Sequence, residues 1–167
     1  MDKTKVTKDL ENKTLIIERI FDAPKEKVWR AYADKDTFEK WWGPEGWQTS
    51  TKEFSLAPGG HIHYCMECTD KNQDDWYGQR SWGLMNIETV DQPDSFTATD
   101  YFSDADGNKN PDMPSQKFTV QLVTEGNKTR LVTRSITATV EQLEELIKTG
   151  MIEGFSSQLN RLEQLLA

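Results

Sequence analysis

The spacing of apolar residues near the end of the chain predicts an amphipathic helix. Between residues 151 and 166 the apolar side chains recur at steps of four, four, three and four residues, which is typical of one helix face. This stripe consists of Met151, Phe155, Leu159, Leu162 and Leu166. We interpret the opposite side as water-facing, and it carries Glu153, Ser157, Asn160, Arg161, Glu163 and Gln164. The stripe needs a partner, and the strand-rich remainder of the chain predicts a sheet.

The preceding residues predict an α+β fold, because strands and helices are segregated along the chain. Strand-like patterns cover residues 14–21, 49–54, 61–69, 77–90, 95–102, 117–125 and 129–137, which predicts a curved antiparallel sheet of about six to seven strands. Two short helices are expected after the first strand, one opening at Pro24 and one capped by Asp34. A further helix begins at Thr139 with a capping-box pattern, and Gly150 is expected to kink it. We expect residues 1–13 to form a flexible tail and residues 14–167 a single domain.

The predicted sheet has more concave surface than one helix can cover. The remaining space is either filled by bulky side chains or left as a ligand cavity. The chain supplies many aromatic residues near the short helices and the middle strands, including Trp41, Trp42, Trp47, Trp76, Tyr77, Trp82, Tyr101 and Phe118. We expect most of them in the core, and those at the open end of the sheet, away from Gly150, to line a pocket.

Charge and composition exclude several classes of partner. The formal net charge is -8 and the pI is about 4.8, which argues against nucleic acid and against an anionic membrane surface. No stretch approaches the ~20 apolar residues of a membrane span. The charged first residues lack the apolar core of a signal peptide, and two cysteines do not make a secreted disulfide framework. A cytoplasmic protein is therefore expected.

A possible metal site is suggested by three residues of one predicted strand. His61, His63 and Cys65 alternate, so they share one face, and histidine and cysteine are zinc ligands. The alternative is that Tyr64 and Met66 point inward and the histidines face water. We favour this alternative and expect no metal and no cofactor.

No nucleophile elbow, P-loop or dinucleotide fingerprint is present. Asp100 is the one carboxylate that stands out, because it interrupts an otherwise uncharged strand. It is either an outward-facing or loop-bracing residue, or an acid/base group inside the cavity.

Several segments taken in order resemble the START-like (SRPBCC) superfamily, in the branch named for the activator of Hsp-ninety ATPase homologue. They are Phe21-Asp22-Ala23-Pro24, Val28-Trp29, Trp41-Trp42-Gly43-Pro44, Pro58-Gly59-Gly60, Thr99 to Asp104 with Gly107-Asn108, Met113-Pro114, Gly150 to Phe155 and Leu159 to Leu162. The resemblance implies a helix-grip fold, in which the sheet grips the C-terminal helix over a cavity. Members mostly bind hydrophobic or aromatic small molecules, and the branch name comes from a co-chaperone with an additional domain.

These observations lead to one function hypothesis and two alternatives. The first is non-enzymatic binding of a small apolar or aromatic molecule by a monomer or homodimer. The expected lining consists of Trp42, Tyr64, Met66, Trp82, Met85, Tyr101, Phe118, Met151, Phe155 and Leu159. The alternatives are a surface that engages a chaperone, and a cyclase- or dehydratase-type enzyme that uses Asp100 or a histidine.

Overall fold

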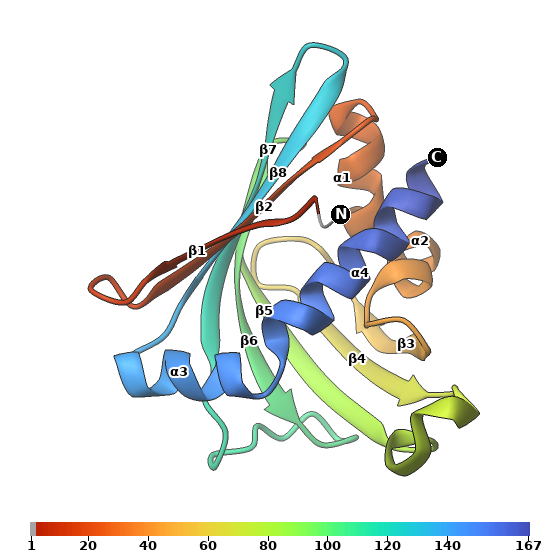
Figure 1. Cartoon of the computed structure of the whole chain (residues 1–167), viewed down its shortest axis with the longest axis vertical. Coiled ribbons are helices and arrows are strands. Elements are labelled where there is room, and N and C mark those ends of the chain that lie inside the picture. Colours follow the sequence, from red (N-terminus) through yellow and green to blue (C-terminus); the bar gives the residue numbers. More distant parts are fainter. Residues whose placement is uncertain (1–2) are drawn as a thin grey trace.

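The computed structural model describes residues 3–167 and contains one antiparallel sheet with four α-helices in that range (Figure 1). The strands follow the spatial order β1-β2-β8-β7-β6-β5-β4-β3. They are β1 (Lys5–Asp9), β2 (Thr14–Phe21), β3 (Trp47–Phe54), β4 (His61–Cys68), β5 (Arg80–Asp91), β6 (Ser95–Ser103), β7 (Gln116–Glu125) and β8 (Lys128–Ile136). The helices are α1 (Lys25–Ala33), α2 (Lys35–Trp41), α3 (Val140–Lys148) and α4 (Met151–Leu166), with a 3-10 segment, η1, at Lys71–Trp76. The α+β prediction is confirmed.

The sheet has one strand more than the sequence predicts, because β1 lies within the expected N-terminal tail. Residues Lys5–Asp9 pair with β2 in antiparallel register, from Lys5 opposite Glu18 to Asp9 opposite Thr14. The expectation of a tail without structure is therefore wrong for these residues. The outer edge of β2 would otherwise present unpaired backbone groups, and a short hairpin satisfies them. Residues 1 and 2 of the predicted tail lie outside the described residues.

The helix boundaries follow local capping chemistry. Asp34 caps α2 as predicted, since its side chain accepts a hydrogen bond from the Thr37 backbone N–H. Thr139 caps α3 in the same way through Gln142 N–H. Pro24 precedes α1 as its N-cap residue, one position earlier than expected. Gly150 separates α3 from α4 with φ +87°, a left-handed conformation that favours glycine, so the predicted kink is confirmed.

Helix α4 crosses the concave face of the sheet, with α1 and α2 beside its C-terminal half (Figure 1). In that half, Leu159, Leu162 and Leu166 are buried in the core. In the N-terminal half, Met151 and Phe155 are only partly buried. The apolar stripe predicted from the sequence therefore packs tightly at one end and spans the sheet more loosely at the other.

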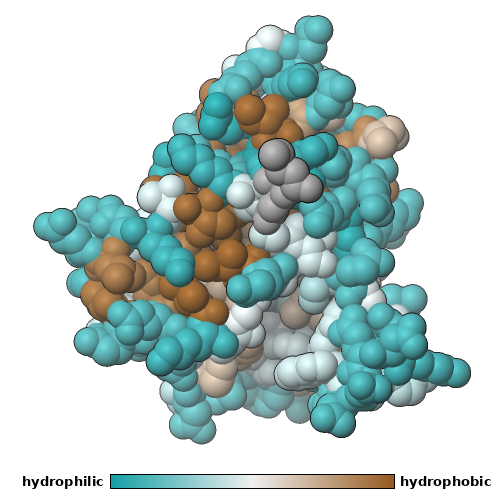
Figure 2. Space-filling view, in the orientation of Figure 1, coloured by the Kyte–Doolittle hydropathy of each residue, from teal (hydrophilic) through white to brown (hydrophobic). Residues whose placement is uncertain are grey.

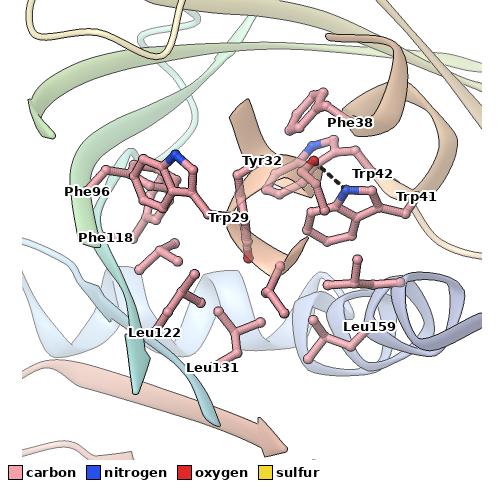
Figure 3. Packing of buried hydrophobic residues seen from close by; sticks show 14 of the residues in the cluster. Trp29, Tyr32, Phe38, Trp41, Trp42, Phe96, Phe118, Leu122, Leu131 and Leu159 are labelled. Carbon is pink, nitrogen blue, oxygen red and sulfur yellow. Dashed lines mark hydrogen bonds between the residues drawn. The ribbon is translucent and has the colours of Figure 1, made fainter. Parts of the chain in front are cut away.

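An aromatic cluster fills the space beneath α1 and α2 (Figure 3). Tyr32 meets Trp41 and Phe96 edge-on, with ring centroids 4.9 and 5.4 Å apart, and Phe38 stacks on Trp42 at 4.8 Å. The Trp41 indole N–H donates to the Ala31 carbonyl at 2.8 Å, so its polar atom is satisfied in the core. The expectation that most of the eight named aromatics belong to the core is wrong, because only Trp41, Trp42 and Phe118 are buried. Trp76 is 62% exposed and Tyr77 49% exposed, and the other three are partly exposed.

Polar contacts attach α4 to the segment between α2 and β3. The Arg161 guanidinium donates to the carbonyl oxygens of Lys40, Trp42, Gly43, Pro44 and Trp47 at 2.8–3.4 Å. The Gln158 Oε1 atom accepts from Gly43 N–H at 2.7 Å, and the Ser157 hydroxyl oxygen accepts from Glu45 N–H at 2.8 Å. Ser157 and Arg161 are therefore structural contacts and not the purely water-facing residues that the helical pattern suggests.

On its other side, α4 is attached to β2. Arg19 is only 3% exposed, and it donates to the Asn160 side chain at 2.6 Å and pairs with Glu163 at 3.3 Å. Asn160 itself is exposed, as the helical pattern suggests, and its side-chain oxygen still accepts from the buried Arg19. Buried charged groups require partners, so these contacts hold the position of α4 across the sheet.

We predict that Arg161→Met lowers the free energy of unfolding by about 2–4 kcal/mol, because several carbonyl oxygens lose a charged donor. Urea denaturation monitored by circular dichroism measures this change. The exposed Arg134, which contacts Gln121, provides the control, and Arg134→Met should cost less than about 1 kcal/mol. Equal effects of the two substitutions would show that the Arg161 contacts do not hold α4.

Candidate ligand cavity

A cavity of about 250 Å³ lies between the sheet and the N-terminal half of α4. Its walls are mostly apolar, and they come from β2, α1, β4, β6, β7, β8 and α4. The lining consists of Ile17, Tyr32, Trp42, Pro44, Tyr64, Met66, Asp100, Gln116, Phe118, Val120, Thr133, Ser135, Thr149, Gly150, Met151, Gly154, Phe155 and Gln158. This volume is slightly below the roughly 300–1,000 Å³ of pockets for drug-sized ligands, so the cavity fits a small molecule.

The cavity lies next to the bend between α3 and α4, since Thr149, Gly150 and Met151 are part of its wall. The space-filling view shows a hollow on this face of the molecule, below α4 (Figure 2). The sequence interpretation placed the pocket away from Gly150, and this is wrong. The other end of α4 is closed because Leu159, Leu162 and Leu166 pack against the core there.

Tyr64 and Asp100 form a hydrogen-bonded pair in the cavity wall. The Tyr64 hydroxyl lies 3.0 Å from both carboxyl oxygens of Asp100. Tyr64 is paired with Gly83 on the neighbouring strand, and a Cβ atom at Gly83 would lie 2.3 Å from the Tyr64 ring. The missing side chain of Gly83 therefore lets the Tyr64 ring lie across β5 and reach β6.

Burial changes the protonation of this pair. It raises the pKa of Asp100 from 3.8 to about 7, although the hydrogen bonds from Tyr64 and from the Tyr101 backbone oppose the rise. Burial and the neighbouring Asp100 charge raise the pKa of Tyr64 well above 10. Among the described residues that line the cavity, Asp100 is the only one with a carboxyl group. The cavity thus holds one carboxyl group that titrates near neutral pH.

Four lining residues carry a buried polar atom without a hydrogen-bond partner among the described residues. These atoms are the Tyr32 hydroxyl, Gln116 Oε1, the Thr133 hydroxyl and Gln158 Nε2. An unpaired buried polar group costs roughly 1–3 kcal/mol, so four of them around one cavity are a large cost. Their clustering is consistent with a site that pairs them with a bound molecule.

The structure brings six of the ten predicted lining residues together. Trp42, Tyr64, Met66, Phe118, Met151 and Phe155 all border the cavity. Met85 and Leu159 are each 1% exposed and belong to the packed core, outside the cavity wall. Asp100 lies on the inner face and not outward, since its side chain reaches Tyr64.

Trp82 and Tyr101 do not border this cavity, and their rings lie on the outer face of the sheet. Trp82 is paired with Cys65, and its ring centroid lies 5.1 Å from that of His63, so it occupies the face opposite Tyr64. The Tyr101 ring contacts the Lys109 ammonium at 4.1 Å, in the loop that follows β6. The alternation along β5 and β6 explains both positions, because Gly83 and Asp100 occupy the inner face.

The candidate metal ligands do not form a site. His61 is exposed and lies 2.9 Å from Asn86 Oδ1, whereas His63 is 4% exposed and its Nε2 lies 3.0 Å from the Asp104 carbonyl oxygen. The expectation that both histidines face water is wrong for His63, because the loop after β6 covers it. Cys65 is buried, and no group of three potential metal ligands occurs within residues 3–167.

Sequence reasoning did not identify Tyr32, Gln116, Thr133 and Gln158 as site residues. Gln158 carried a usable signal, because it lies three residues after Phe155 and four before Leu162, on the apolar side of α4. Thr133 carried a weaker signal, since it lies two residues after the buried Leu131 on β8 and therefore shares its face of the strand. A polar residue at such a position is either paired in the core or directed to a cavity, and the sequence alone does not distinguish these cases.

The fold and cavity define a helix-grip protein, in which a curved sheet holds a C-terminal helix over an internal pocket. Residues 22–167 match the family described as Activator of Hsp90 ATPase homolog 1-like protein, and the chain belongs to this family. No helix within residues 3–167 is long and apolar enough to cross a membrane. No functionally curated protein matches the chain.

Solved structures of similar proteins cover nearly the whole chain. The crystal structure of protein Ms6760 from Mycobacterium smegmatis is 34% identical, with a TM-score of 0.87, over 98% of this chain and 96% of that one. An NMR structure of a protein from Arthrobacter aurescens is 28% identical, with a TM-score of 0.87, over 97% and 90%. A third, from Staphylococcus epidermidis, is 27% identical, with a TM-score of 0.81, over 97% and 93%.

We predict that Asp100→Asn reduces the pH dependence of stability between about pH 4 and 7. The raised pKa means that Asp100 binds more protons in the folded state than in the unfolded state in this window, so its contribution to stability falls as the pH rises. One group contributes at most about 1.4 kcal/mol per pH unit. The variant should therefore be more stable than the wild type at pH 8, with little difference at pH 4.

Urea titrations at several pH values measure this effect, with Asp112→Asn in the exposed loop as the control. An Asp100→Asn variant whose stability follows the wild-type pH dependence would contradict the assignment of a raised pKa to Asp100.

Proposed function

We propose that this protein binds a small aromatic or otherwise apolar molecule in the cavity under α4, without catalysing its conversion. The observation that carries the proposal is a largely apolar pocket of about 250 Å³ that opens beside the tightly packed core. Protein interiors are close-packed, and voids much larger than a water molecule are few. Apolar wall surface that stays open to water forgoes the free energy of burial, so an apolar ligand that fills this pocket would gain it.

The shape of the wall supports a flat ring system as the ligand. Trp42, Tyr64, Phe118 and Phe155 surround the cavity and offer ring faces and edges. Aromatic pairs gain roughly 0.5–1.5 kcal/mol beyond their buried area when rings stack or meet edge-on. A ring-containing ligand would use this wall better than an extended hydrocarbon chain would.

A second candidate function is acid/base catalysis, and the Tyr64–Asp100 pair favours it. A carboxyl group with a pKa of about 7 inside a cavity is suited to exchange a proton near neutral pH. The wall offers no second ionisable carboxylate or histidine to complete a longer relay. Binding alone remains the better-supported function, and a chaperone-directed role is supported only by the description of the family.

Gly154 offers a direct way to close the cavity. It lines the pocket from α4, and a Cβ atom built there would meet no heavy atom within 4 Å. We predict that Gly154→Phe fills the space and abolishes ligand binding. Gly154→Ala is the matched control, because it leaves most of the volume free and should stabilise the helix by about 1 kcal/mol.

Native mass spectrometry of the three proteins, purified from the original host, provides the measurement. The wild type and Gly154→Ala should carry the same adduct, lost on denaturation, and folded Gly154→Phe should lack it. An equal adduct on Gly154→Phe would place the ligand elsewhere. A wild type that has no adduct and binds no aromatic fragment in ligand-observed NMR would contradict the proposal.

A further inference from the structure

Gln158 presents a hydrogen-bond donor to the cavity, and a backbone contact fixes its orientation. Its Oε1 atom accepts from Gly43 N–H at 2.7 Å, whereas a flipped amide would set two donors against each other. The Nε2 atom is therefore held on the remaining side, where it has no partner among the described residues. The side chain is 5% exposed and belongs to the cavity wall.

Two hydroxyl groups from other elements extend this donor set. Tyr32 on α1 is 2% exposed and Thr133 on β8 is 5% exposed, and neither hydroxyl has a partner among the described residues. In Figure 3 the Tyr32 hydroxyl points away from the rings of Trp41 and Trp42. Burial raises the pKa of Tyr32, so this hydroxyl keeps its proton and remains a donor. Together with Gln158, these groups can donate to a ligand oxygen.

Acceptor groups lie at another part of the same wall. Gln116 and Asp100 are directly opposite each other on the neighbouring strands β7 and β6, so their side chains share the inner face. Gln116 Oε1 is buried without a partner among residues 3–167, and the Asp100 carboxyl accepts from Tyr64. Two adjacent acceptors can receive a hydrogen from an amine or hydroxyl group of a ligand.

The sheet register separates the acceptors from Thr133, a member of the donor set. Thr133 is opposite Val120 on β7, and Gln116 lies four residues earlier on the same strand. At about 3.3 Å per residue, the two positions are roughly 13 Å apart along β7. A small ring system with polar groups at opposite ends has a comparable length.

We infer that the cavity selects a ring-containing molecule with a hydrogen-bond acceptor oxygen at one end and a hydrogen-bond donor at the other. The oxygen is held by Gln158, Tyr32 and Thr133, and the donor, an amine or hydroxyl group, is held by Gln116 and Asp100. This inference rests on the proposed function and narrows its ligand class. A pure hydrocarbon would fill the same volume but leave the unpartnered atoms of Gln158, Tyr32, Thr133 and Gln116 without a hydrogen bond.

Two matched probes distinguish these ligand classes, namely biphenyl and 4′-aminobiphenyl-4-ol. They share a carbon skeleton, and only the second has polar groups at both ends. Quenching of tryptophan fluorescence gives the dissociation constants, since Trp42 lines the cavity. We expect the polar probe to bind at least about tenfold more tightly, as two or more new hydrogen bonds would produce.

Tyr32→Phe and Thr133→Val remove unpartnered hydroxyls with little change of shape. Each should weaken binding of the polar probe by about threefold to tenfold and leave biphenyl affinity unchanged. Neither should lower the melting temperature of the free protein, because no internal hydrogen bond is lost. Thr129→Val is the matched control, since the buried Thr129 hydroxyl donates to the Ala23 carbonyl at 2.7 Å. It should lower the melting temperature without changing the affinity ratio of the two probes.

Equal affinity for both probes, or Tyr32→Phe and Thr133→Val variants that keep the wild-type ratio, would overturn the inference while leaving a binding cavity in place. Failure of both probes to bind would overturn the inference and count against the proposed function as well. Where a probe binds, the Gly154→Phe variant shows whether it binds in the cavity, because only binding inside the cavity is lost in that variant.

Discussion

The attachment of α4 to the segment between α2 and β3 is the constraint on which the site depends. Arg161 donates to the carbonyl groups of this segment, and Gln158 accepts from Gly43. On the opposite side, Arg19 reaches Asn160 from β2. These contacts, together with the buried Leu159 and Leu162, hold the C-terminal half of the helix against the core. The apolar side chains under the N-terminal half therefore need not fill the gap completely, and a cavity persists.

This arrangement connects stability with binding. Gln158 uses one end of its amide to hold α4 and leaves the other end at the cavity wall. Tyr32 has a similar double role, since its ring packs against Trp41 and its hydroxyl, beside the cavity, has no partner in the described part of the chain. A ligand that satisfies these atoms would reduce the cost of their burial and should stabilise the folded chain. The family match and the similar solved structures establish the fold but name no ligand. The proposed function therefore rests on the chemistry of the cavity wall.

Most of the fold could be predicted from hydrophobic periodicity and capping residues, and less of the site could. The stripe on α4, the Asp34 cap and the Gly150 kink depend on neighbouring residues, so the local pattern was sufficient. Strand β1 was missed because its exposed, charged residues resemble a tail until the register with β2 is known. Trp82 was assigned to the wrong face for a related reason, since a register position decides which face a strand residue occupies. The unpartnered polar atoms belong to four separate elements, and the helical position of Gln158 shows only that it faces inward, not whether it has a partner there.

The most direct test of the central claim is a high-resolution crystal structure of the protein purified from its original host. We predict continuous density for one small ring-containing molecule between α4 and the sheet, within hydrogen-bond distance of Gln158 Nε2 and of the Tyr32 or Thr133 hydroxyl. A cavity closed by movement of α4 toward the sheet, or one containing only separate water molecules that pair all these polar atoms, would contradict the claim that the site is built for a ligand.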